Sequence, residues 1–151
     1  MKLLPFLQDL PIFKRLGEHD LAALTTAARL FEYPEGYRFS EESAPGQCAY
    51  LLVNGRVRVF QHDALIGEVL GVGEIGAGEM FNLPALVERL AISSTAVALE
   101  SSVALELSRA ALVTLRETSP RTALRLQHMI AVQLATALHA RNSLLLERLK
   151  A

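Results

Sequence analysis

The sequence predicts a mainly β fold with flanking helices: a β-roll, or double-stranded jelly roll, between N-terminal helices and a long C-terminal helix. Residues 1–31 show helical apolar spacing, residues 37–107 form short β-branched segments separated by glycines, and residues 108–151 return to helical spacing. At 151 residues the chain can bury a core of its own, so we expect one domain over 1–151.

The N-terminal segment is predicted to form amphipathic helical pieces up to residue 31. Leu21, Leu24 and Ala28 recur at helical spacing, and Gly17 separates this piece from the one before it. Pro34-Glu35-Gly36 then has the composition of a turn into the roll.

The middle of the chain is predicted to be a series of short strands. Tyr50-Leu51-Leu52-Val53 runs into Asn54-Gly55, the strongest two-residue hairpin signal, so we expect this strand to pair with the next one. The next strand alternates polar and apolar residues, which should turn Val57 and Val59 inward and Arg56 and Arg58 outward. Further strands are expected over 69–75, 95–99 and 103–107.

The C-terminal segment is predicted to hold a short helix followed by a long one. Ser108 can cap a helix over 109–117, and Pro120 can begin a second helix that continues to the end. One apolar row comprises Leu124, Ala131, Leu138 and Leu145, and a second comprises Ile130, Leu134, Ala137 and Leu144. One row can pack on the roll and the other on a second copy of the helix. We therefore expect a homodimer through residues Leu124, Ala131, Leu134, Leu138 and Leu145; the alternative is that both rows cover the roll.

Composition excludes several classes of protein. The net charge of −1 and pI of about 6.4 give no indication of direct nucleic-acid binding. The single cysteine, Cys48, excludes a disulfide framework within the chain and is interpreted as a packing residue, which suits a cytoplasmic protein. The N-terminal apolar run is too short and interrupted for a signal peptide, and no stretch is long enough to span a membrane.

Five motifs in order resemble the cyclic nucleotide-binding domain of catabolite-activator and FNR-type regulators and of protein kinase A regulatory subunits. They are Leu10–Leu16, Tyr33–Gly36, Tyr50–Val59, Gly76–Phe81 and Ser94–Glu100. The resemblance implies a regulatory domain in which a short helix inside the roll presents backbone N–H groups to a cyclic phosphate. It also implies an Arg paired with the phosphate and a Glu that accepts the ribose 2′-hydroxyl.

The ligand cassette of the resembled family maps onto Phe81, Asn82, Leu83, Ala85, Leu86, Arg89, Ile92, Ser93 and Ser94. Two departures stand out. Leu83 occupies the position of the family's Glu, and Ile92, nine residues later, occupies that of its Arg. Asn82 also replaces a family Gly, and Arg89 is the nearest substitute cation in sequence. Glu79 matches a structural Glu of the family and not the sugar-binding one.

These departures predict that cAMP and cGMP, although possible ligands, are disfavoured, and no cofactor is expected. A buried phosphate without its Arg would lack a counter-charge, and the ribose hydroxyl would lack its acceptor. An apolar cavity could take another small ligand or be closed by side chains, and an unidentified protein partner is a further possibility.

No pattern indicates catalysis or a metal site, so we expect a protein that is not an enzyme. His19, His62, His128 and His139 are scattered without zinc spacing, and His62 is interpreted as a surface residue in preference to a haem ligand. Ser93, Ser94 and Thr95 have no base and acid beside them in sequence. Two alternatives to a degenerate regulatory module remain: a genuine cyclic-nucleotide sensor with non-standard contacts, and the sensor half of a transcriptional regulator. The sequence leaves open whether the chain is full-length.

Overall fold

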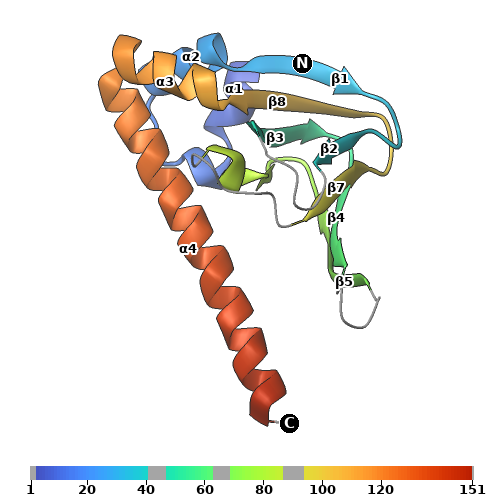
Figure 1. The fold of residues 1–151 in the computed structure, drawn as a ribbon. Helices are drawn as coiled ribbons and strands as arrows, with labels where there is room; N and C mark the ends of the chain where they lie inside the picture. The colour runs from blue at the N-terminus through green and yellow to red at the C-terminus, as the bar shows by residue number, and fades with distance from the viewer. Residues whose placement is uncertain (1–2, 41–46, 63–68, 87–93, 151) are drawn as a thin grey trace.

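The structure is a computed structural model that describes residues 3–40, 47–62, 69–86 and 94–150 (Figure 1). The N-terminal elements are α1 (Leu3–Gln8), the 3-10 helix η1 (Pro11–Phe13) and α2 (Glu18–Ala27). The strands are β1 (Arg29–Tyr33), β2 (Arg38–Ser40), β3 (Cys48–Asn54), β4 (Val57–His62), β5 (Val69–Ile75), β6 (Met80–Phe81), β7 (Thr95–Ala98) and β8 (Ser102–Ser108). The 3-10 helix η2 (Leu83–Leu86) follows β6, and α3 (Arg109–Thr118) and α4 (Pro120–Lys150) end the chain.

Two antiparallel sheets form the roll, as the fold class predicts. Their strand orders are β1-β8-β3-β6 and β2-β7-β4-β5. Strand β3 is buried on both faces: Tyr50 and Leu52 pack into the roll interior, whereas Leu51 and Val53 pack among the helices. The first sheet therefore separates two apolar cores, and helices cover its outer face.

The roll interior is rich in aromatic rings. Tyr50 and Phe81 stack with ring centroids 5.2 Å apart, and Phe39 meets both rings edge-on at 5.0 and 5.1 Å. Because Phe81 is the last residue of β6, this cluster fixes the point at which the chain enters η2.

Several predicted local features are confirmed. Ser108 Oγ accepts a hydrogen bond from the backbone N–H of Ala111 at 3.0 Å and caps α3. Gly36 has a φ of +84°, which the turn before β2 requires. Val57 is fully buried and Val59 partly so, whereas Arg56 and Arg58 are exposed.

Two local predictions are wrong. The strands on either side of Asn54-Gly55 do not pair: β3 lies in one sheet and β4 in the other, so the turn carries the chain between sheets. The N-terminal helical region also ends earlier than residue 31. Ala28 already has extended backbone, with φ −87° and ψ 168°, and Arg29–Tyr33 pairs with β8 as an edge strand. Pairing with β8 outweighs the local helical spacing here.

Helix α4 runs past the roll, and its C-terminal end projects beyond both sheets (Figure 1). Its N-terminal half packs on the helical core through Ala123, Leu126 and Ile130. At 31 residues the helix is about 46 Å long at 1.5 Å per residue, so only part of it can lie against this roll.

Candidate functional site

The chain turns sharply at Asn82, between β6 and η2. Its φ is +60°, and Asn82 is the single non-glycine residue with positive φ in the described part of the chain. Asn tolerates this left-handed conformation better than most residues. Its side-chain Oδ1 accepts a hydrogen bond from Ser40 Oγ at 3.2 Å, and its carbonyl accepts one from Ala85 N at 3.0 Å. The Asn at this glycine position of the resembled family thus keeps a conformation that glycine adopts readily.

A cavity of about 490 Å³ lies between this turn, the β4–β5 pair and helix α4. Its walls from the roll are Val59, Gly73, Glu74, Ile75, Met80, Phe81, Asn82, Leu83, Pro84 and Ser94, and its wall from the helix is Gln133, Leu134, Ala137 and Leu138. Most of these side chains are apolar. The described walls carry hydrogen-bonding side chains at Glu74, Asn82, Ser94 and Gln133, and no lysine or arginine.

Leu83 lies at the cassette position where the resembled family has its ribose-binding Glu. Its side chain is 7% exposed, lines the cavity and also packs into the helical core with Leu51 and Leu86. This position is therefore an apolar one on a packed surface, and it offers a ribose hydroxyl no acceptor.

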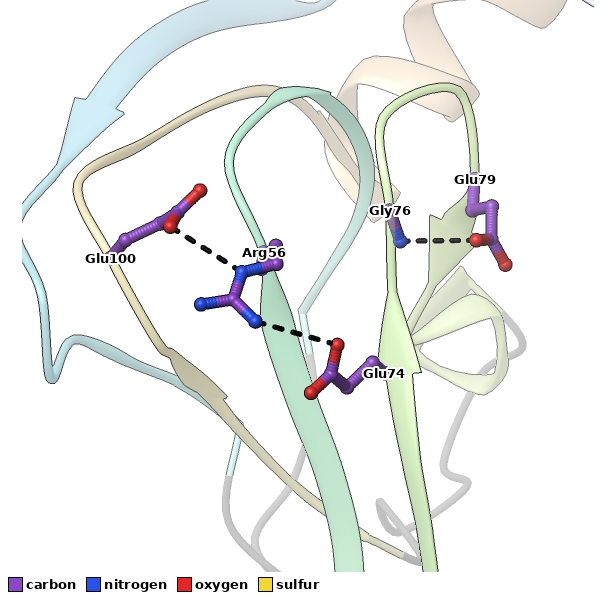
Figure 2. Close-up of polar contacts among 5 residues, drawn as sticks. All are labelled: Arg56, Glu74, Gly76, Glu79 and Glu100. Atoms are coloured by element: carbon purple, nitrogen blue, oxygen red, sulfur yellow. Dashed lines mark hydrogen bonds and ion pairs between the residues drawn. The ribbon is translucent and has the colours of Figure 1, made fainter.

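The two carboxylates nearest this wall in sequence are both engaged (Figure 2). Glu74, which lines the cavity, lies 3.8 Å from Arg56 Nη1, and Arg56 Nε in turn donates to Glu100 Oε2 at 3.4 Å. Glu79 Oε1 accepts from the backbone N–H of Gly76 at 3.0 Å across the β5–β6 turn. Glu79 thus stabilises its own turn, in agreement with its interpretation as a structural residue.

The structure brings only part of the predicted cassette to the cavity. Phe81, Asn82, Leu83 and Ser94 line it. Ala85 and Leu86 are buried beneath the surface, and the Ala85 carbonyl accepts a hydrogen bond from Arg109 Nε at 3.1 Å. Arg89, Ile92 and Ser93 lie outside the described residues.

Three further elements line this cavity, and none of them is expected from the cassette motif. Val59 and Ile75 form one wall from adjacent strands, and Gln133 and Ala137 line it from α4. The inward alternation of Val57 and Val59 is a sequence signal for the first wall. No local signal relates residues near 135 to those near 82, because their proximity depends on how α4 packs.

The predicted dimer residues divide into two groups on α4. Leu124, Leu138 and Leu145 are 68%, 60% and 56% exposed, and Ala131 is exposed as well. Leu134 differs, since it is partly buried against the helical core. The alternative in which both apolar rows cover the roll is wrong for the described residues, because these three leucines stay more than half exposed.

The remaining titratable candidates give no second site. His19, His128 and His139 are exposed, and the side chain of His62 lies outside the described part. The described residues contain no group of His, Cys, Asp and Glu that could hold a metal ion. Burial, together with the charge of Glu106, raises the pKa of the Cys48 thiol to about 11, so this thiol stays protonated at neutral pH.

None of the helices among the described residues combines the length and the hydrophobicity that crossing a membrane requires.

Comparison with known proteins gives consistent matches. The family model described as cyclic nucleotide-binding domain matches residues 30–119. The chain is 33% identical to the cyclic AMP receptor protein of Thermus thermophilus over 129 residues, which are 84% of this chain and 58% of that protein.

Two solved structures show the same fold. The catabolite activator protein of Thermus thermophilus has a TM-score of 0.73 and 28% identity, over 89% of this chain and 62% of that one. A cyclic nucleotide-binding domain from Methylobacillus flagellatus has a TM-score of 0.77 and 21% identity, over 92% and 77% of the two chains. The chain spans less than two thirds of the length of the curated relatives it matches.

Proposed function

The chain belongs to the cyclic nucleotide-binding domain family, and from this premise we propose that it is a non-catalytic, dimeric regulatory module that does not bind cAMP or cGMP tightly. The family assignment supports a domain whose role is to respond to a ligand or partner. Its chemistry at the cavity differs from what a cyclic nucleotide needs.

The observation that carries this proposal is the composition of the cavity wall. A cyclic phosphate entering between the roll and α4 would meet the carboxylate of Glu74 and, among the described lining residues, no lysine or arginine. Taking an anion out of water without a counter-charge costs several kcal/mol. Replacement of the family's ribose-binding Glu by Leu83 removes a further acceptor, which costs about 1–3 kcal/mol.

The dimer is proposed from the exposed row on α4. Three leucines in one row, each more than half exposed, are unfavourable in water and match the seven-residue spacing of a helix pair. A second copy of α4 is the partner with the same pattern, and a two-fold axis would bring each row against itself.

Calorimetric titration of the purified protein with cAMP and cGMP tests the ligand part of the proposal. We expect no submicromolar binding of either nucleotide. The double variant Leu83→Glu/Ile92→Arg should gain affinity for cAMP, because it supplies the hydroxyl acceptor and the counter-charge. Leu83→Gln/Ile92→Gln is the matched control, which adds polarity without charge. Submicromolar binding to the unaltered chain would overturn the proposal.

A second candidate is a genuine cyclic-nucleotide sensor with non-standard contacts. It is favoured by the 33% identity to a cyclic AMP receptor protein, of which the chain matches a little over half. In this case Arg89 is the cation to test: cAMP should bind, and Arg89→Gln should abolish binding. If the chain is instead the sensor half of a transcriptional regulator, a gel shift with this chain alone should be negative.

A further inference from the structure

A second hollow lies along the N-terminal half of α4 and meets the cavity of the cassette at Gln133. It is a groove of about 640 Å³ between η1 with the loop after it and the stretch Leu124–Gln133 of α4. Its length along the helix is about 14 Å, from nine steps of 1.5 Å. Both the volume and the length are in the range of sites that hold small organic ligands.

The floor of the groove is apolar. Ile12 and Leu16 contribute from the N-terminal side, and Met129 and Val132 from α4. Ile12, Leu16 and Met129 are partly buried against the helical core, so the floor is anchored, whereas Val132 is 46% exposed. An apolar body could therefore displace water from a surface that is already shaped.

The rim of the groove is basic. Lys14, Arg15 and Arg125 line it together with His128, and none of the described residues that line it is an aspartate or glutamate. Arg125 is engaged by Asp20 at 2.6 Å. Lys14 and Arg15 are exposed and form no ion pair within the described part of the chain. Lys14 and Arg15 therefore place two exposed cations beside an apolar floor.

We propose that this groove binds a small anionic amphiphile, a carboxylate on an extended apolar body. The apolar body lies on Ile12, Met129 and Val132, and the carboxylate meets Lys14 and Arg15. A neutral apolar molecule would leave the two cations unused, and a cationic one would be repelled by them.

The groove shares only Gln133 with the lining of the cassette cavity and only Leu124 with the proposed dimer row. At 3.6 residues per turn, the α4 residues that line the groove lie on average about 120° around the helix from the row that contains Leu124, Ala131, Leu138 and Leu145. Leu124 stands at the border of the two surfaces. A dimer through that row would leave the groove open, so the two proposals can fail separately.

Calorimetric titration of the whole chain with decanoate, decanol and decyltrimethylammonium tests the proposal. We expect saturable binding of decanoate below about 1 mM, and at least about tenfold weaker binding of the other two. In a methyl-labelled sample, the Ile12 and Met129 signals should shift on titration.

Variants locate the site. Lys14→Glu/Arg15→Glu should raise the decanoate Kd by at least about tenfold. Arg29→Glu/Arg121→Glu makes the same charge change at exposed positions outside the groove and should leave the Kd unchanged. Val132→Glu, on an exposed helix position, should weaken binding in the same way as the first pair.

Three results of the titrations would overturn the proposal. They are no saturable binding of decanoate, equal binding of decanol, and a Kd that the Lys14/Arg15 reversal leaves unchanged. Shifts confined to the methyls of Ile75 and Leu134 would likewise overturn it, because they would assign the ligand to the cassette cavity.

Discussion

Removing the carboxylate of Asp20 should destabilise the fold by about 3 kcal/mol, because this group joins α2 to the start of α4. Asp20 is 2% exposed. It accepts hydrogen bonds from Thr122 Oγ1 at 2.6 Å, from Arg125 Nη1 at 2.6 Å and from the backbone N–H of Gly17 at 3.0 Å. Two of these donors lie in α4, about a hundred residues away in sequence.

The magnitude follows from what Asp20→Ala leaves behind. The hydroxyl of Thr122, 1% exposed, would lose its acceptor, at about 1–3 kcal/mol. Loss of the side-chain contact to the Gly17 N–H at the start of α2 adds about 1 kcal/mol. The Arg125 side chain is 54% exposed and regains water, so its share is at most about 1 kcal/mol.

Urea unfolding at a fixed protein concentration measures the effect, with Asp9→Ala, an exposed aspartate, as the control. Thr122→Val should cost less than Asp20→Ala, and Thr122→Ser should be close to neutral. A loss below about 1 kcal/mol for Asp20→Ala would refute the reasoning.

The pH dependence of stability gives an independent check. Burial alone would raise the pKa of Asp20, but the hydrogen bonds from Thr122, Gly17 and Arg125 outweigh it and hold the pKa below its usual value. The carboxylate therefore contributes stability above the unfolded-state pKa of about 3.9, and this contribution is lost as the pH falls through the lower folded-state pKa. The stability difference between the natural chain and Asp20→Asn should shrink over that acidic range and stay constant between about pH 5 and 8.

Three further predictions concern the roll and α4. Gly55→Ala should lower the free energy of unfolding by about 3 kcal/mol in thermal or urea unfolding, because Gly55 has a φ of +112° and the new Cβ would lie 2.7 Å from Ser102 Cβ. Gly73→Ala is the control: a Cβ there would meet open space, so the loss of stability should be far smaller. Asn82→Ala should lower the free energy of unfolding by about 1 kcal/mol and Asn82→Gly by less than half of that, because glycine adopts the positive φ of residue 82 more readily than alanine. Equal losses for the two variants would argue against backbone conformation as the cause. Leu138→Glu should convert the dimer to a monomer in sedimentation experiments, and a natural chain that sediments as a monomer at micromolar concentration would contradict the dimer itself.

The features that the sequence predicts well are those decided within a few residues. Ser108 caps a helix because its hydroxyl reaches the N–H three residues on, and Pro120 begins one because its missing N–H costs nothing there. Gly36 and Gly55 both have positive φ, so turns lie where the sequence predicts them.

What the sequence predicts poorly depends on distant partners. Asn54-Gly55 has the composition of a hairpin turn, yet the same turn also lets the chain pass from one sheet to the other. The sheet of each flanking strand is decided by its partner, which is β8 for β3 and β7 for β4. Arg29–Tyr33 has helical spacing before it but finds a strand partner in β8. The cavity depends on distant partners in the same way. The cassette can be identified from its own residues, whereas the α4 wall depends on how the helix packs on the roll.

Helix α4 connects these features, and Leu138 is the residue at which they meet. It lines the cavity beside the cassette and also stands on the exposed row that we assign to the dimer. A second copy packed on that row would therefore cover one side of the cavity mouth, and a ligand that contacts Leu138 would change the surface offered to the partner. By linkage, a ligand that binds the dimer more tightly than the monomer must strengthen dimerisation by the same factor. Because Asp20 holds the first turns of α4 at Thr122 and Arg125, movement of the helix caused by such a ligand should be greatest towards its C-terminal end.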